Sequence, residues 1–209
     1  MSQRLIAAVL GGTAPRAKTE LHDVAFAVGD ALEAVYDQLL DDWFGDPRGL
    51  HVDAWCFLDS VAGYRVQLSP APADNGLHLY FINIGGYRSG VFAEHHAWGF
   101  FGAPGKAEAK QRAKQTLLQT HVETHKDDLH EVDDCLQVAR IGEWHVHLTP
   151  DASAGEPEVS NGYFPLPKSV IDRWIAQRDP RRANSTPRRL SRRIPAAAAI
   201  SVAMLRDRQ

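Results

Sequence analysis

Cysteine is scarce in this sequence. Only Cys56 and Cys135 occur among 209 residues, which is too few for a disulfide framework, and neither has the neighbours of a zinc site. We therefore expect two reduced, partly buried thiols in a cytoplasmic protein. Apolar runs are short as well. None approaches the roughly 20 residues that cross a bilayer, and the apolar N-terminal stretch runs directly into Gly11-Gly12. We interpret it as a first strand, not as a signal peptide, and expect no membrane partner.

Signature motifs of common enzymes are also missing. The glycine pairs match neither GxGxxG nor GxxxxGK[ST], so they predict no phosphate-binding loop of those kinds. No GxSxG segment is present, which removes the usual mark of a serine-hydrolase elbow. Cys56 has no histidine beside it in the sequence that would activate it as a nucleophile. The sequence therefore identifies no reaction.

Charge is unevenly distributed. The net charge is −3, yet residues 171–209 contain ten Arg and three Asp, a balance of +7. The segment from Arg178 to Pro195 combines three prolines, clustered arginines and few apolar groups, which is typical of a flexible tail without its own core. The stretch from Arg181 to Arg193 is a candidate for binding nucleic acid. The alternative is a solvated arm, or one that lies on the acidic body or on a second subunit.

An internal repeat is the main feature of the chain. A shift of 74 residues superimposes Gly11-Gly12 on Gly85-Gly86 without a gap. The same shift matches several polar residues in each half. It places Glu20 on Glu94, His22 on His96, His51 on His125 and Asp53 on Asp127.

The last part of the repeat can be aligned between the two halves in more than one way. A shift of 80 matches residues 64–70 with residues 144–150, whereas a shift of 79 matches His51 with His130 and Cys56 with Cys135. The order of strands and helices is the same under each shift. In the first repeat we predict strands at 5–10, 20–28, 51–58 and 64–68, with a helix at 31–44. In the second we predict strands at 77–84, 91–101, 129–138 and 144–148, with a helix at 106–119.

These patterns predict an α+β fold. We expect an internal duplication of a strand-strand-helix-strand-strand unit, mainly antiparallel, with helices packed on the sheet and a pseudo-two-fold axis. The predicted organisation is repeat 1 at 1–73, repeat 2 at 74–150, a linker and C-terminal helix at 151–177, and a flexible tail at 178–209. Each repeat alone is small for a stable core, so we expect one joint body.

The repeated polar residues are the candidate site. Glu20 and His22 alternate with the apolar residues up to Val28, so they should share a face that packs against the helix. A carboxylate and an imidazole turned inward need a partner. The glycine pair allows close approach of the backbone. The candidate ligand-binding residues are Gly11, Gly12, Glu20, His22, His51, Asp53, Gly85, Gly86, Glu94, His96, His125 and Asp127.

Three interpretations of these residues remain open. The first is a divalent metal site, with Glu20, His22, His51, Asp53, Glu94 and His96 among its ligands. The second is a pocket for a small anion or another polar ligand. The third is structural, with Glu and His bracing the Gly-Gly bend. The identity of any cofactor stays open, and a divalent metal is the candidate.

The segments LGGTAPRAKTELHDVAFAVGD, HVDAW and FINIGGYRSGVFAEHH resemble a bacterial family known as domain of unknown function 1543. The resemblance covers about residues 5–140 and implies one or two copies of the domain, without implying an activity. Our leading hypothesis is a non-enzymatic module that binds a small polar ligand or a protein partner, including a second copy of itself. The alternatives are a metal-dependent hydrolase that uses the same residues and nucleic-acid binding through the tail.

Overall fold

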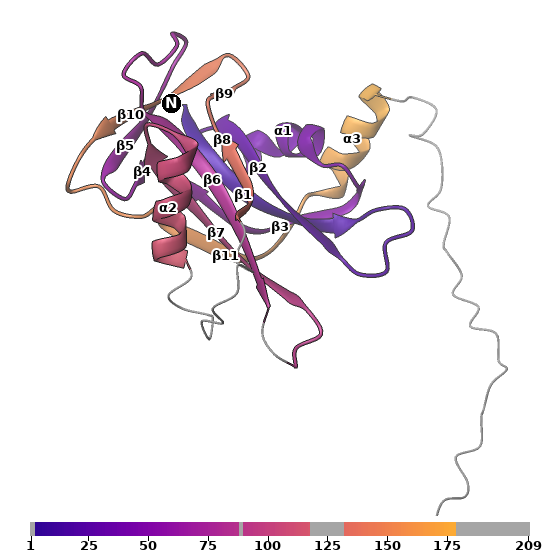
Figure 1. Cartoon of the computed structure of the whole chain (residues 1–209). Helices are drawn as coiled ribbons and strands as arrows, with labels where there is room; N and C mark the ends of the chain where they lie inside the picture. The colour runs from indigo at the N-terminus through magenta and orange to yellow at the C-terminus, as the bar shows by residue number, and fades with distance from the viewer. Residues whose placement is uncertain (1–2, 88–89, 118–131, 179–209) are drawn as a thin grey trace, which may run out of the picture.

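The computed structural model describes residues 3–87, 90–117 and 132–178 (Figure 1). Strands dominate, and three helices accompany them. In chain order the elements are β1 (Arg4–Thr13), β2 (Leu21–Gly29), a 3-10 turn (Glu33–Val35), α1 (Tyr36–Asp42), β3 (Asp46–Phe57), β4 (Ser60–Val61), β5 (Tyr64–Ser69), β6 (His78–Tyr87), β7 (Glu94–Ala103), α2 (Lys106–Leu117), β8 (Val132–Gln137), β9 (Arg140–Ile141), β10 (Trp144–Pro150), β11 (Val159–Pro165) and α3 (Lys168–Arg178).

The strands form three antiparallel sheets. The first sheet has the order β11-β3-β1-β2, and the second has the order β7-β6-β8. The third sheet, β4-β5-β10-β9, joins strands from both halves of the sequence. Antiparallel sheets with helices packed on them confirm the α+β class.

Strand β1, in the middle of the first sheet, is buried on both faces. Ile6, Ala8 and Leu10 of β1 pack beneath α1 and α3, whereas Leu5 and Ala7 point to the opposite side, toward the second and third sheets. Helix α2 covers the remaining face of the second sheet, as Figure 1 shows. The sequence of a strand that is buried on both faces does not alternate between polar and apolar residues, so it does not show which face meets which layer.

The alternating face of β2 lies on the side opposite to the predicted one. Val24, Phe26 and Val28 do not face the helix but the second half of the chain. The Phe26 ring centroid lies 6.0 Å from that of Phe81. Ala25 and Ala27 lie under the helices instead. Small residues let the helices approach the sheet closely, while the larger side chains fill the space between the sheets, so the prediction of a helix-facing stripe was wrong.

Two further elements differ from their predicted form. Helix α1 ends at Asp42 and begins only at Tyr36, after the 3-10 turn, so it is shorter than predicted. The stretch predicted as a linker contains β11, which extends the first sheet by pairing with β3. All but one residue of β11 is exposed, so this edge strand lacks the apolar alternation that would mark it in a sequence. The C-terminal helix predicted within 151–177 is α3, with Ile171 and Ile175 buried against the sheet.

Strand pairing follows the repeat closely. In the first half Gly11 lies opposite His22, and in the second Gly85 lies opposite His96. Both residues are displaced by 74 positions, so the two hairpins share one register. In the third sheet, β5 and β10 pair around Gln67 and His147. Those two residues correspond under the shift of 80, so each half contributes the equivalent strand to the third sheet. We call the β5–β10 pair, which joins the two halves, the seam.

Acid stability should depend on the turn after β10. Hydrogen bonds from Ser153 and from the Arg65 guanidinium lower the pKa of Asp151 from 3.8 to about 2. A carboxylate with a lowered pKa in the folded protein stabilises it above about pH 4, and this contribution disappears as the pH falls toward 2. We expect Asp151→Asn to flatten the loss of stability over that interval, measured by urea unfolding. Asp74→Asn, at an exposed loop position, is the control, and an equal flattening there would contradict the assignment.

No helix among residues 3–87, 90–117 and 132–178 is long and apolar enough to cross a membrane. The Arg181–Arg193 segment, His125 and Asp127 lie outside the described residues.

Candidate functional site

Gly11 is the floor of the site. It is the point of β1 at which His22 of β2 and His51 of β3 lie opposite on either side. A Cβ atom at this position would lie 2.3 Å from His51 Nε2 and 2.6 Å from Asp53 Oδ2. Such distances are shorter than any van der Waals contact, so the absent side chain of Gly11 is what lets the polar groups meet. On the opposite face of β1, Gly12 leaves room for Trp43, since a Cβ atom at Gly12 would lie 2.8 Å from the Trp43 ring.

Four side chains gather above Gly11, and we call Glu20, His22, His51 and Asp53 the polar cluster. His51 Nε2 lies 3.3 Å from Glu20 Oε1 and 3.3 Å from Asp53 Oδ1. His22 Nε2 lies 3.2 Å from Asp53 Oδ2 and 3.9 Å from Glu20 Oε2. Each imidazole therefore lies between two carboxylates, and the first-half residues singled out from the sequence do converge.

A bulge in β3 contributes to this arrangement. Leu10 pairs with Val52 and Val9 with Ala54, which leaves Asp53 as the extra residue. A bulge bends its strand locally and redirects side chains, and bulges are common beside functional sites. Here the extra residue is the carboxylate that contacts both imidazoles.

His51 is the buried centre of the cluster. Its side chain is 4% exposed, and the Tyr163 ring of β11 lies against it with 4.6 Å between centroids. Its Nδ1 lies 3.1 Å from the Gly49 carbonyl oxygen. A carbonyl only accepts, so Nδ1 must carry a hydrogen and donate it. In a neutral ring Nε2 then has a lone pair, and this lone pair faces the two carboxylates.

The carboxylate side of the cluster is also incompletely paired. Within the described part of the chain, Asp53 Oδ2 is a buried side-chain oxygen without a hydrogen-bond partner. It lies near His22 Nε2 without hydrogen-bond geometry. A lone pair of His51 and two negative carboxylates in contact repel one another unless a positive charge lies among them.

The other two members lie at the open side of the cluster. The side chains of Glu20 and His22 are 50% and 45% exposed. The prediction that this Glu and His turn fully inward was therefore wrong, and the buried imidazole is His51. In their present positions, the residues that the structure describes include no group of three or more His, Cys, Asp or Glu side chains placed to hold a metal ion.

The second half is built differently. His96 Nδ1 lies 3.0 Å from Asn83 Oδ1, and Asn83 Nδ2 donates to Asp134 at 3.4 Å. His96 Nε2 is also 3.6 Å from Glu94 Oε2. Gly85 and Gly86 are buried in β6 beside them. Asn83 occupies the position of Val9 in the first half, so this histidine has an amide partner that has no counterpart near Gly11.

The strand register also shows how the third motif aligns. Ile84 pairs with Val132 just after a bulge, as Leu10 pairs with Val52 in the first half. Val52 therefore corresponds to Val132, which is a shift of 80 residues. Matching His51 with His125 instead requires a shift of 74. The position that corresponds to His51 under the shift of 80 lies outside the described residues. Among the described residues the halves already differ, because His96 contacts Asn83 where the first half has Val9.

Sequence reasoning missed three contributors to these sites, Asn83, Asp134 and Tyr163. Asn83 and Asp134 lie opposite each other in β6 and β8, next to a bulge that an ungapped shift of the sequence cannot show. Cys56 is not a further member. Burial raises the pKa of its thiol to about 11, which keeps it protonated and a poor nucleophile near neutral pH.

Comparison with known proteins agrees with the repeat. The family described as Domain of Unknown Function (DUF1543) matches residues 17–68 and 91–140. The crystal structure of protein Il1583 from Idiomarina loihiensis is 32% identical, with a TM-score of 0.59, and the match covers 80% of this chain and 99% of that one. None of the curated proteins matches. The chain belongs to the family described as Domain of Unknown Function (DUF1543), with two copies in tandem.

Proposed function

We propose that the protein is a cytoplasmic binding module and that the polar cluster binds a divalent cation. The observation that carries the proposal is the buried His51, whose Nδ1 donates to the Gly49 carbonyl and whose Nε2 faces two carboxylates. A metal-binding histidine typically donates its other ring nitrogen to a backbone carbonyl or carboxylate in this way.

The composition of the cluster favours a cation over the other ligands considered. An anion would meet the negative charge of Glu20 and Asp53. Two imidazoles with two carboxylates are donors suited to zinc, manganese or iron. The buried Asp53 Oδ2, which lacks a hydrogen-bond partner among the described residues, would gain one from such an ion.

Cation binding requires the cluster to close. Because Glu20 and His22 are half exposed, their side chains can rotate at little cost, while His51 and Asp53 are held by the sheet. Four protein donors are typical of a structural site, whereas a catalytic site keeps one position open. We therefore propose binding and not hydrolysis.

The same proposal includes the origin of the fold. We infer that a strand-strand-helix-strand-strand unit was duplicated and that the halves are related by a pseudo-two-fold axis near Gln67 and His147. The shared registers of the two hairpins and of the β5–β10 pair support this inference. The free thiols of Cys56 and Cys135 agree with a reducing compartment. Nucleic-acid binding through Arg181–Arg193 stays a prediction.

Calorimetric titration of the full chain with zinc and with manganese tests the cation site. We expect one strong site, and we expect His51→Ala to weaken it at least about tenfold, the lower end of what loss of a supporting residue costs. His145→Ala is the matched control, since His145 lies on β10 in another sheet. No uptake of either ion by the unaltered protein would refute the proposal.

A further inference from the structure

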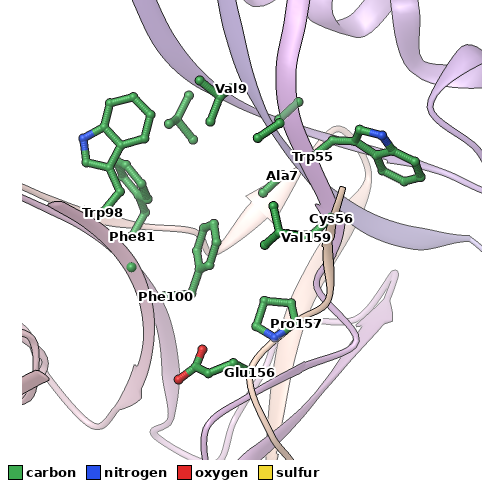
Figure 2. Close-up of a pocket in the computed structure, with 14 residues that line it drawn as sticks. Ala7, Val9, Trp55, Cys56, Phe81, Trp98, Phe100, Glu156, Pro157 and Val159 are labelled. Carbon is green, nitrogen blue, oxygen red and sulfur yellow. The ribbon is translucent and has the colours of Figure 1, made fainter. Parts of the chain in front are cut away.

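A second feature, an apolar cavity, lies between the first and second sheets. Its volume is about 240 Å³. Figure 2 shows Phe81, Trp98 and Phe100 on one side and Ala7 and Val9 on the other. The Trp55 ring points away from this space, toward the helix side of its strand. The cavity is therefore walled by strands of both halves.

The cavity follows from an asymmetry between the repeats. Under the shift of 74, Ala7 corresponds to Phe81 and Val24 to Trp98, and all four line the cavity. The second half supplies large rings at positions where the first half has small side chains. Because packed protein layers are usually filled by side chains, the space left between these two sheets reflects that difference in side-chain size. An apolar cavity of about 150 Å³ is known to admit benzene, so this one has room for a single ring with a short substituent.

One end of the cavity carries negative charge. Glu156 and Pro157 lie at that end, and Glu156 is the single charged side chain of the lining (Figure 2). Beyond it is a polar groove of about 420 Å³, which shares Glu156 with the cavity and adds Glu158 and the Arg4–Asp59 ion pair. Among the described residues Glu156 and Glu158 have no ion-pair partner, so the rim keeps an excess of negative charge.

We propose that this cavity is a binding site for a small apolar amine, with the hydrocarbon part between the two sheets and the ammonium group at Glu156. The rings of Trp98 and Phe100 offer contact area to a flat apolar ligand. Partial burial raises the pKa of Glu156, which means that its charged form gains from a positive partner.

The site is separate from the polar cluster. Val9 lines the cavity, and Gly11 lies two residues further along the same face of β1. Two residues span roughly 7 Å of strand. The proposal needs neither the metal ion nor any member of the cluster, so the two sites can be tested independently.

The experiment uses 2-phenylethylamine as the probe, with 2-phenylethanol as its uncharged analogue, titrated into the full chain by calorimetry. We expect the amine to bind on the order of tenfold more tightly than the alcohol, as one charge-assisted hydrogen bond provides. Glu156→Gln should remove that preference while leaving the alcohol unaffected. Glu143→Gln, at a turn outside the cavity lining, is the control.

A second variant tests whether the hydrocarbon part of the ligand lies in the apolar cavity. Val24→Phe introduces a ring where the second half has Trp98 and should abolish binding of both probes by filling the cavity. Equal affinity for amine and alcohol, or no binding of either to the unaltered protein, would overturn the proposal. Because Glu156 is at the rim, its substitution keeps the test decisive even if Val24→Phe fails to fold.

Discussion

Gly11→Ala is expected to abolish cation binding and to lower the free energy of unfolding by about 1–3 kcal/mol, the usual cost of overpacking. The added methyl group would lie 2.3 Å from His51 Nε2, and His51 is buried and held by its bond to the Gly49 carbonyl. The imidazole must therefore move out of the cluster or push β1 away from β3. Urea unfolding and zinc titration of the same variant measure both effects.

The control for this substitution is Gly155→Ala, in the loop before β11. Nothing lies within 4 Å of a Cβ atom built there, and its backbone is not left-handed. It should leave both stability and cation binding unchanged. Unaltered zinc affinity in Gly11→Ala would show that the ion, if bound, does not use His51.

Leu148→Ala is expected to cost about 2–5 kcal/mol of unfolding free energy, the range for deleting a buried leucine side chain. Leu148 is fully buried in β10, opposite Val66 of β5, in the core that both halves share. Because this seam joins the halves, we expect the variant to unfold in one transition at a lower denaturant concentration. Circular dichroism and tryptophan fluorescence should give coincident curves.

Leu136→Ala provides the comparison, since Leu136 on β8 is 52% exposed. We expect it to change stability by no more than about 0.5 kcal/mol, as exposed substitutions usually do. Two separated transitions in Leu148→Ala would contradict a shared core and indicate that the halves fold independently.

The part of the site formed within one hairpin was readable from the sequence. The repeat matches Gly11 with Gly85 and His22 with His96, and in both hairpins the glycine and the histidine lie opposite each other. Such pairing depends on local chain geometry, which the spacing of residues determines. The convergence of His51 onto the same glycine depended on a strand that returns after a helix, which the spacing of residues does not place.

Other features could not be read from the sequence. The bulge at Asp53 changes the alignment of the third motif, and an ungapped comparison of the halves cannot register one extra residue. Exposure was also misjudged, because Glu20 and His22 lie near the end of the sheet, where no second layer covers them. Tyr163 reaches His51 from an edge strand without an apolar pattern.

The sequence by itself determined the duplication, the α+β class and the glycine that leaves room for the polar side chains, because these depend on periodicity and on residues that lack a side chain. Only the tertiary structure decided which face of β2 meets the helices, which histidine is buried, and that small residues of one half face large rings of the other across a cavity. Those outcomes depend on how sheets pack on one another, and both faces of a doubly buried strand look alike in a sequence.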